Sequence, residues 1–380
     1  MSTNEKITIM HIAQAAGGVD KYLQMLLKYI DKQKYKNILI CSFDYNPEDY
    51  KGLADVFEQI EMQHSIGLSD LKNAIKLRKL IKKYAPDIVY SHSSKAGAIT
   101  RMANIGIKNK SVYNPHGWAF NIRCSKIRQN TYVALEKLMA LFCDKIICIS
   151  NAEKNSALNK KICKENKTQV ILNGIDFEKY DMKKHNYVSL TRHQLAIPEN
   201  AFIVGMVGRL ENQKAPDIFM KTARIIKDLI PQSFFILVGN GNQEEKVLQY
   251  AKEYLLNDSL LITGWVNNPD SYIDLFDVAM LLSRWEGFGL VLAEYMMMRK
   301  PIVATNVDAI PEIINDHKNG LLVQVDDYES AAKSVVDLYN NPELKMKLVE
   351  QGYHDVYKRF DVKRVADEHN DFFQKLITDR

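Results

Sequence analysis

Short β-branched segments alternate with amphipathic helical segments along this chain, and the alternation occurs twice. Strands that alternate with helices in this way form parallel sheets with helices on both faces. In the first half, apolar residues recur every three to four positions in three clear helix candidates: 19–29, 71–84 and 128–142. The expected strands of this half are 7–12, 37–43, 87–91, 111–114, 145–149 and 169–172.

The pattern restarts after a turn-rich passage at residues 173–176, and the second set of expected strands is 202–207, 234–238, 260–263, 278–282 and 302–305. A chain of 380 residues is long enough for two to three domains of roughly 150 residues. We therefore predict an α/β fold with two Rossmann-like, doubly wound domains, 1–175 and 176–360, whose strand ends open onto a cleft. A last helix in 361–380 is expected to pack back on the first domain.

The composition excludes several classes of protein. With 46% hydrophobic and 26% charged residues, the chain is neither disordered nor collagen-like. The longest uncharged apolar stretches, such as 138–143, are too short for a membrane-spanning helix of roughly 20 residues, and the N-terminus lacks the features of a signal peptide. The five cysteines show no C-x-x-C pair and no zinc-ligand spacing, so we expect free thiols and a cytoplasmic protein.

Charge is distributed unevenly between the two halves. Residues 1–175 hold 27 Lys and Arg against 15 Asp and Glu, and the remainder holds 24 against 31, so a net charge of +5 divides into +12 and −7. A basic half could face nucleic acid, an anionic membrane or a phosphorylated ligand, or it could carry ordinary solvated lysines. One predicted helix alone carries Lys72, Lys76, Lys79, Lys82 and Lys83.

Each half opens with a strand, a glycine-bearing loop and a helix. In the first half this loop is 15–18, where Gly17 and Gly18 allow backbone amides to approach a phosphate at the start of a helix, although such glycines also serve tight turns. The loop is not a G-x-G-x-x-G fingerprint, and no acidic residue follows the second strand at the expected place. A nicotinamide-dependent dehydrogenase is therefore disfavoured.

Two cations follow the first strand of the second half. Arg209 ends the strand segment, and Lys214 stands just before a helix that Pro216 starts. They could clamp a diphosphate and neutralise charge that develops on a departing phosphate, or they could be an ordinary surface pair.

Two glutamates in residues 283–294 are the most informative feature. Glu286 lies in a glycine-punctuated loop after a strand, and Glu294 follows eight positions later in a largely apolar helix. Loop amides and the helix N-terminus can receive sugar hydroxyls or phosphate oxygens, and carboxylates can accept hydrogen bonds from vicinal diols. Glu294 could instead be a solvated helix residue, but a buried glutamate is rare without a partner. This segment predicts a sugar-nucleotide site.

The run 286–294 resembles the E-x7-E region of family 4 glycosyltransferases, which are retaining enzymes of the GT-B fold. The resemblance spans essentially the whole chain and is closest to bacterial enzymes of capsule, exopolysaccharide and lipopolysaccharide assembly. Two positions depart from the family pattern, because Ala215 and Ala309 stand where glycine is usual. The supporting motifs occur in the family's order at 17–18, 93–97, 114–118, 149–150, 173–176, 208–214, 239–241, 301–305, 311–312 and 319–322.

The resemblance implies roles for individual residues. Arg209 and Lys214 would hold the donor diphosphate, Glu286 and His116 would contact the transferred sugar, and Glu294 would bind the ribose hydroxyls. Further contacts with the donor are expected at Gly17, Gly18, Gly239, Gly241, Val266, Phe288, Gly289 and Leu290. No Asp-x-Asp triplet occurs, so the diphosphate-binding metal site of the other main glycosyltransferase fold is missing. We expect no metal and no cofactor, with cationic side chains in place of the metal.

The expected reaction moves a hexose or N-acetylhexosamine from a nucleoside diphosphate sugar, with uridine preferred over guanosine, to a saccharide or a lipid-linked (polyprenyl diphosphate) acceptor. His92, Ser94 and Lys95, where a strand passes into a helix, are expected to meet an acceptor phosphate. The lysine-rich helix predicts peripheral association with the anionic inner face of the cell membrane. Nucleic acid is not an expected partner. A non-catalytic sugar-nucleotide-binding scaffold and a sugar-nucleotide epimerase are the alternatives.

Overall fold

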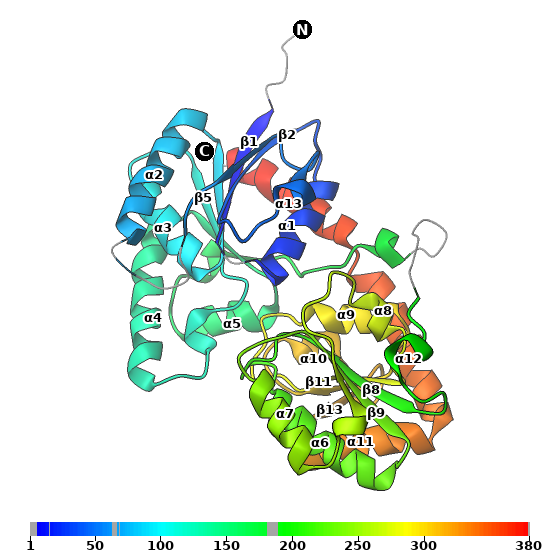
Figure 1. Ribbon diagram of the computed structural model, residues 1–380. Helices are drawn as coiled ribbons and strands as arrows, with labels where there is room; N and C mark the ends of the chain where they lie inside the picture. The colour runs from blue at the N-terminus through cyan, green and yellow to red at the C-terminus, as the bar shows by residue number, and fades with distance from the viewer. Residues whose placement is uncertain (1–5, 15, 63–66, 68, 181–188, 379–380) are drawn as a thin grey trace. The chain divides into compact units, whose positions relative to one another are not determined.

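The computed structural model describes residues 6–14, 16–62, 67, 69–180 and 189–378 (Figure 1). It divides the chain into two compact domains. The first contains the chain up to Gly174 together with the segment from Val362 onward, and the second runs from Ile175 to Asp361. The boundary at 174/175 lies one residue from the predicted position. The predicted C-terminal helix is α13 (Val362–Thr378), and it belongs to the first domain.

The sheet of the first domain has seven parallel strands in the order β3-β2-β1-β4-β5-β6-β7. Six of them lie within a few residues of the predicted segments, and β3 is an edge strand that the sequence pattern did not predict. The strands are β1 (Ile7–Ala13), β2 (Tyr35–Cys41), β3 (Val56–Gln59), β4 (Ile88–His92), β5 (Lys110–Asn114), β6 (Lys145–Cys148) and β7 (Thr168–Val170).

Helices cover both faces of this sheet, as alternating strands and helices require. Helix α1 buries Tyr22, Leu23, Leu26 and Leu27, which form one stripe because they are one turn apart. The apolar face of α13 packs on α1 and joins the same core, where Phe373 is completely buried. The helices are α1 (Gly18–Tyr29), α2 (Ser69–Tyr84), α3 (Ser94–Asn104), α4 (Lys126–Met139), α5 (Asn151–Asn159) and α13.

The second domain has six parallel strands in the order β10-β9-β8-β11-β12-β13. They are β8 (Phe202–Val207), β9 (Ser233–Val238), β10 (Leu260–Ile262), β11 (Val278–Leu281), β12 (Ile302–Thr305) and β13 (Leu321–Val323), of which β13 was not predicted. The helices are α6 (Pro216–Leu229), α7 (Glu244–Glu253), α8 (Asp270–Ile273), α9 (Leu290–Met297), α10 (Ile310–Ile313), α11 (Tyr328–Asn340) and α12 (Pro342–Arg359).

Short 3₁₀ helices complete the connections: Pro47–Tyr50, Ala119–Asn121, Ala140–Phe142, Glu165–Lys167, Phe177–Tyr180, His193–Leu195 and Asn257–Ser259. Within the described ranges, no helix has both the length and the apolar character needed to cross a membrane.

Both sheets reverse their strand order at one place. The reversal falls between β1 and β4 in the first domain and between β8 and β11 in the second. In doubly wound sheets, ligands bind beyond the carboxyl ends of the strands at such a switch point. The loops that follow β8 and β11 are the ones that carry Arg209, Lys214 and Glu286, so topology alone brings these residues to one edge of the second sheet.

Candidate active site

The loop after β8 presents one exposed cation and one enclosed cation. The amide of Gly208 donates to the carbonyl of Val238 at 2.9 Å, which ties the loop to the end of β9. Arg209 is exposed, and its guanidinium makes one long hydrogen bond of 3.4 Å to Oε1 of Gln213. Lys214 is largely enclosed, with 15% of its side chain exposed. The two cations therefore differ in how freely each could meet a ligand.

The two departures from the family pattern have different structural consequences. Ala215 keeps a left-handed backbone, with φ of 51°, just before α6, although its Cβ makes that conformation about 1–2 kcal/mol less favourable than for glycine. Its methyl group is completely buried in the core of the domain. Ala309 has an ordinary φ of −84°, so this position does not require glycine. The loop before α6 thus keeps the glycine-like conformation without the glycine.

Lys214 and Glu286 bring the loops after β8 and β11 together. Nζ of Lys214 lies 2.6 Å from Oε2 of Glu286, and the glutamate side chain is only 10% exposed. The hydroxyl of Ser283 donates to the same carboxylate oxygen at 3.1 Å. The backbone amide of Glu286 donates to Oδ2 of Asp308 at 2.8 Å. The carboxylate is thus held in one position beside the cation, at the switch point of the sheet.

Arg284 holds these loops together, and it is not among the site residues predicted from the sequence. Its guanidinium pairs with Asp217 at 2.8 Å and with Asp326 at 2.7 Å, and it donates to the carbonyl of Asn212 at 3.0 Å. Burial disfavours the charged form of Asp217, but the hydrogen bond and charge of Arg284 outweigh it and lower the pKa of Asp217. A cation two positions after the apolar segment 278–282 was the available signal.

The glycines predicted near the donor in this domain have a packing role. A Cβ at Gly239 would stand 2.2 Å from the carbonyl oxygen of Gly208, and one at Gly241 would stand 2.5 Å from that of Leu210. These glycines therefore let the loop after β8 approach the end of β9 closely. Their contact with a donor stays a prediction.

The remaining donor positions follow β10 and surround the start of α9. Val266 is partly exposed beside the exposed Trp265. Gly289 precedes α9 with φ of 89°, and Leu290 is the first residue of the helix. Phe288 is buried, and its ring packs edge-on against that of Phe360, with the ring centroids 5.7 Å apart.

Glu294 is a buried residue of α9. Burial of Tyr180 is the main cause of the strongly raised pKa of its hydroxyl. The negative charge of the Glu294 carboxylate raises that pKa further. Glu294 is therefore not a solvated surface residue. The role of Glu294 in binding ribose stays a prediction.

In the first domain, Gly17 and Gly18 face open space. Gly17 has a φ of 100°, and a Cβ built on either glycine would meet no atom within 4 Å. The carbonyl of Gly17 accepts the amide of Lys21 at 3.1 Å as α1 begins. Ala15, which starts the predicted loop 15–18, lies outside the described residues. Packing among the described residues therefore gives no reason for the glycine at position 18.

His116 follows β5 in a strained turn. Its φ is 50°, and its backbone amide donates to Oδ1 of Asn114 at 3.0 Å. The ring lies edge-on to that of Tyr22, with centroids 4.6 Å apart, and its Nε2 lies 3.1 Å from Nδ1 of His92. Burial lowers the pKa of His116 to about 3, so the imidazole is neutral at physiological pH.

Glu153 supports this turn, and it too is absent from the site residues predicted from the sequence. Its two carboxylate oxygens accept hydrogen bonds from the amides of Gly117 at 2.6 Å and Ile149 at 2.7 Å. The hydroxyl of Ser150 accepts the amide of Glu153 at 3.0 Å and so caps α5. The Ser-x-x-Glu pattern at 150–153 is a capping-box signature and was the available signal.

The three residues predicted to bind an acceptor are not equally accessible. His92 is completely buried, and its two ring nitrogens face His11 and His116. Nζ of Lys95 lies 3.0 Å from Asp70, with 11% of the lysine side chain exposed. Ser94 begins α3 and is partly exposed. Binding of an acceptor by these residues stays a prediction.

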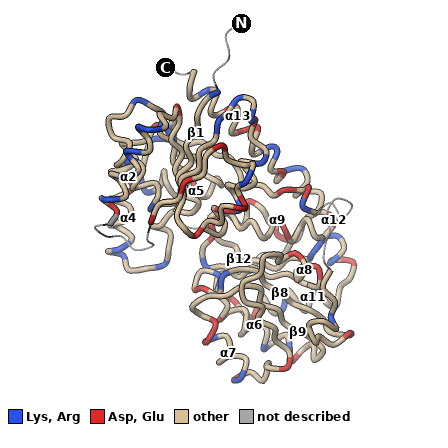
Figure 2. Tube along the Cα trace, turned by 45° about the horizontal axis from the view of Figure 1, so that its top comes forward, with Lys and Arg blue, Asp and Glu red and all other residues tan. Residues whose placement is uncertain are grey.

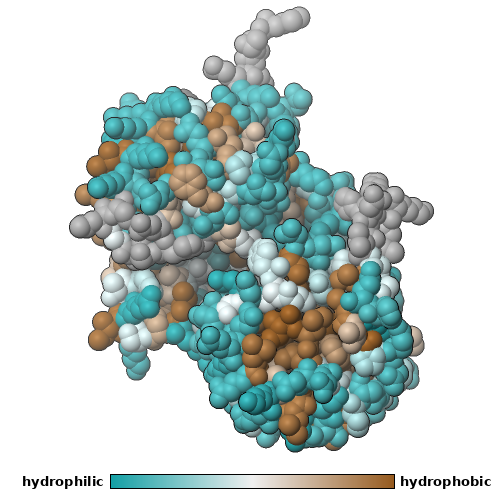
Figure 3. Space-filling model, viewed as in Figure 1, coloured by the Kyte–Doolittle hydropathy of each residue, from teal (hydrophilic) through white to brown (hydrophobic). Residues whose placement is uncertain are grey.

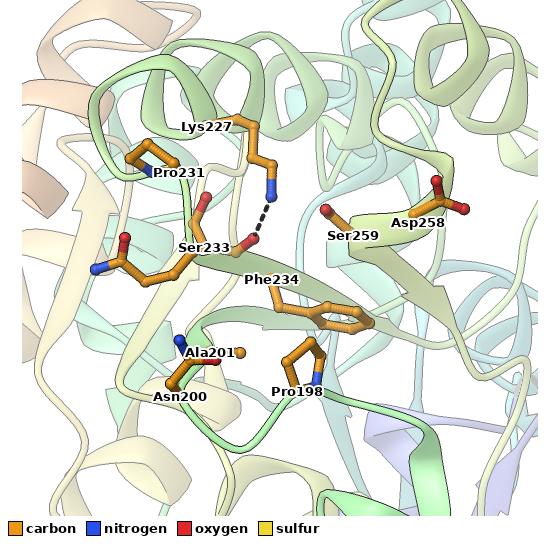
Figure 4. A pocket seen from close by; sticks show the side chains of 10 residues that line it. Pro198, Asn200, Ala201, Lys227, Pro231, Ser233, Phe234, Asp258 and Ser259 are labelled. Atoms are coloured by element: carbon orange, nitrogen blue, oxygen red, sulfur yellow. Dashed lines mark hydrogen bonds between the residues drawn. The ribbon is translucent and has the colours of Figure 1, made fainter.

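A cavity of about 390 Å³ lies at the opposite edge of the second sheet (Figure 4). Its lining includes Ala201, Phe234 and Ser259, which stand at the amino ends of β8, β9 and β10. Lys227 donates to the carbonyl of Ser233 there at 3.0 Å. This cavity is therefore distinct from the loops that hold Lys214 and Glu286.

Within the described part of the chain, no three His, Cys, Asp or Glu side chains form a group that could hold a metal ion.

Comparison with known proteins matches each domain to a family. Residues 16–179 match Glycosyltransferase Family 4, and residues 189–355 match the glycosyl transferases group 1. The chain is 27% identical, over 100% of both chains, to the UDP-Gal:alpha-D-GlcNAc-diphosphoundecaprenol alpha-1,3-galactosyltransferase of Escherichia coli. It is 26% identical to the capsular polysaccharide biosynthesis glycosyltransferase CapM of Staphylococcus aureus, over 94% of this chain and 96% of that protein.

Solved structures show the same architecture. HepE of Anabaena in complex with UDP-glucose has a TM-score of 0.82 at 20% identity and covers 97% of this chain and 100% of its own. A sucrose-phosphate synthase of Thermosynechococcus elongatus has a TM-score of 0.81 at 19% identity, over 99% of this chain and 100% of its own. The predicted GT-B fold is confirmed. The chain thus has the GT-B fold, with a first domain that matches Glycosyltransferase Family 4 and a second domain that matches the glycosyl transferases group 1.

Proposed function

We propose that this chain transfers a hexose or N-acetylhexosamine from a UDP-sugar to a lipid-linked or saccharide acceptor, with retention of anomeric configuration, during assembly of a cell-surface polysaccharide. The pairing of Lys214 with Glu286 at the switch point is the observation that carries the proposal. We assign the cation of this pair to the donor diphosphate and the acid beside it to the transferred sugar. The names of the galactosyltransferase relative and of the HepE complex support uridine as the base.

In the proposed reaction, the bond between the anomeric carbon and the diphosphate breaks as negative charge grows on the leaving oxygens. Arg209 and Lys214 stabilise that charge, which is the largest contribution expected where no metal takes part. The acceptor oxygen joins the anomeric carbon on the face that the diphosphate leaves, and a phosphate oxygen takes the acceptor proton. Neither a protein nucleophile nor a cofactor is needed, and positioning supplies much of the remaining rate enhancement.

Other residues position the donor. We assign the ribose hydroxyls to Glu294, the base to the backbone near Val266, and the sugar to Glu286, His116 and the amides at the start of α9. The amides of Phe288, Gly289 and Leu290 lie where that helix begins, and a helix N-terminus favours the electronegative oxygens of a ligand. The loop at Gly17 and Gly18 leaves open space for a phosphate or a sugar.

We further propose that α2, α3 and α4 form a membrane-docking surface. Helix α3 packs against both α2 and α4. Large apolar side chains are exposed on α2, on α4 and on the 3₁₀ helix that follows α4, with exposed fractions of 64% for Leu71, 81% for Ile127 and 72% for Leu141. Figure 3 shows apolar patches among polar side chains on this side of the domain, and Figure 2 shows its basic residues. The predicted lysines of α2 are all exposed, at Lys72, Lys76, Lys79, Lys82 and Lys83.

Apolar and cationic side chains on one surface match the chemistry of an anionic bilayer, where each basic residue contributes roughly 1 kcal/mol. Docking there would bring the first domain to a lipid-linked acceptor. The E. coli relative is named for a diphosphoundecaprenol acceptor, which agrees with this arrangement.

A transfer assay tests the proposed function. The purified chain is given a panel of UDP- and GDP-sugars with the label in the sugar, together with polyprenyl diphosphate saccharides, in the presence of EDTA. We expect labelled lipid product from one UDP-sugar, with the anomeric configuration of the donor. Label that stays on the nucleotide with altered stereochemistry would indicate an epimerase. Binding of the nucleotide without transfer to any acceptor would indicate a scaffold.

A further inference from the structure

Four histidines come together in the interior of the first domain, and the proposed reaction uses only one of them. His11 lies in β1, His92 ends β4, His116 follows β5 and His369 lies in α13. His11, His92 and His369 are completely buried. The rings of His11 and His92 are stacked, with centroids 5.5 Å apart and an interplanar angle of 14°.

Hydrogen bonds join three of these rings into a chain that starts at a carboxamide. Oδ1 of Asn37 lies 3.4 Å from Nε2 of His11, and Nδ1 of His11 lies 3.3 Å from Nε2 of His92. Nδ1 of His92 lies 3.1 Å from Nε2 of His116. Both ring nitrogens of His11 and of His92 are therefore engaged. No described residue bonds to Nδ1 of His116.

All three rings are neutral, because burial lowers the pKa of His11 and His116 to about 3 and that of His92 well below its usual value. A neutral imidazole has one N–H donor and one acceptor nitrogen, so fixing one end of such a chain fixes every proton in it. The carboxamide oxygen of Asn37 can only accept. His11 and His92 must then each carry the proton on Nε2 and accept on Nδ1, and His116 donates from its own Nε2.

We propose that Asn37, His11 and His92 are positioning residues that fix His116 in its Nε2–H tautomer and leave its Nδ1 as an acceptor for a hydroxyl of the transferred sugar. The inference rests on the proposed function, which assigns His116 to the sugar. His92 then acts through His116 instead of on an acceptor. The geometry thus assigns the kind of ligand group that His116 recognises. Its Nδ1 accepts a hydrogen bond, so it favours a group that donates, such as a hydroxyl, and disfavours a group that only accepts.

A second set of hydrogen bonds fixes Tyr22, whose ring contacts that of His116. Nδ1 of His369 lies 2.7 Å from the carbonyl of Val365, which can only accept, so Nε2 of His369 is the acceptor nitrogen. The hydroxyl of Tyr22 lies 2.9 Å from that Nε2 and donates to it. Tyr22 is thereby fixed with its ring edge-on to His116. The C-terminal helix thus reaches the proposed sugar contact through one tyrosine.

Long-range ¹H–¹⁵N correlation spectra of the chain labelled with ¹⁵N-histidine test the proposal without any substrate. We expect His11, His92 and His116 to be neutral and protonated on Nε2 at pH 7. Protonation of His116 on Nδ1, a mixture of its tautomers, or a charged ring would overturn the proposal. The measurement needs only the wild-type chain, so it does not depend on whether a variant folds.

His92→Phe supplies the functional arm, because phenylalanine keeps a stacked ring and removes both hydrogen bonds. We expect the tautomers of His116 to become mixed and kcat/KM to fall about tenfold, as for the loss of one hydrogen bond to the sugar. A folded variant with the wild-type spectrum of His116 and wild-type kcat/KM would contradict the proposal. If His116→Ala leaves kcat/KM unchanged while the wild-type tautomers are as expected, the assignment of His116 to the sugar fails and the hydrogen-bond chain stands.

Discussion

Nζ of Lys214 lies 2.6 Å from Oε2 of Glu286, so the cation assigned to the donor diphosphate is paired with the acid assigned to the transferred sugar. An arriving diphosphate brings negative charge to a site that already holds a carboxylate. The diphosphate therefore competes with Glu286 for Lys214, so binding of the leaving group affects the position of the acid. Arg209, which is exposed in the same loop, adds positive charge and forms no ion pair with another described residue.

Glu286→Gln should separate binding from turnover. Removing the carboxylate frees Lys214 and lowers repulsion of a diphosphate, so we expect UDP to bind about tenfold more tightly. Turnover should fall about 10²-fold, because the charge beside the reacting carbon is lost. Titration calorimetry with UDP and steady-state kinetics give the two numbers. Glu245→Gln, at an exposed position of α7, is the control, and weaker UDP binding in Glu286→Gln would argue against the assignment.

The glycines of the two domains should respond differently to substitution. Gly18→Val adds side-chain atoms in open space, so we expect an unchanged Tm and a KM for the donor raised about tenfold or more. Gly241→Ala forces a Cβ to within 2.5 Å of a backbone oxygen, which should lower stability by about 1–3 kcal/mol. Thermal unfolding and donor titration distinguish the two outcomes. A wild-type KM in Gly18→Val would remove that loop from the donor site.

Sequence pattern predicted most of the fold because parallel strands buried on both faces are continuous apolar runs. The segments 202–207 and 302–305 coincide with β8 and β12. The two missed strands, Val56–Gln59 and Leu321–Val323, are short edge strands of three or four residues. Such short runs carry no periodic signal, and their pairing with a neighbouring strand is what identifies them.

The sequence predicted those parts of the candidate active site whose position follows from the order of the strands. The loops after β8 and β11 lie at the switch point, so Lys214 and Glu286 were both expected at the donor site, but their ion pair was not predicted. Hydrogen bonds between segments far apart in the sequence could not be predicted in this way. Arg284 and Glu153 act by joining segments 36, 42 and 67 positions apart in sequence. His369 reaches Tyr22 across 347 positions, and no local pattern marks it.

The buried histidines predict an acid-labile fold. Burial lowers the pKa of His11 to about 3 and that of His369 to about 4, against 6.5 for a free histidine. Above pH 6.5 these groups are neutral in both states and contribute nothing. Below pH 6.5 the unfolded chain binds protons that the folded chain does not, so the free energy of unfolding falls as the pH drops toward 4.

Each fully buried histidine adds up to about 1.4 kcal/mol per pH unit to that slope. Urea unfolding between pH 7 and pH 4.5 measures it. His369→Gln should flatten the slope, while His317→Gln, at an exposed position, should leave it unchanged. Equal slopes in the wild type and in His369→Gln would contradict the lowered pKa.

The membrane-docking surface predicts binding to anionic vesicles. Lys76→Glu with Lys79→Glu reverses two charges on α2, and we expect the affinity for anionic vesicles to fall tenfold or more, from roughly 1 kcal/mol per basic residue. Vesicle sedimentation measures the affinity. The matched control reverses Lys246 and Lys252 on α7 of the second domain. Equal binding of the wild type to anionic and neutral vesicles would remove the electrostatic part of the proposal.

Arg209→Ala tests whether the cations of the loop after β8 stabilise the departing diphosphate. Arg209 is exposed and makes one long side-chain hydrogen bond, so Tm should not change. We expect kcat for sugar transfer in EDTA to fall about 10²-fold. Arg224→Ala, at another exposed arginine in the same domain, should keep the wild-type rate. Wild-type kcat in Arg209→Ala would contradict the account.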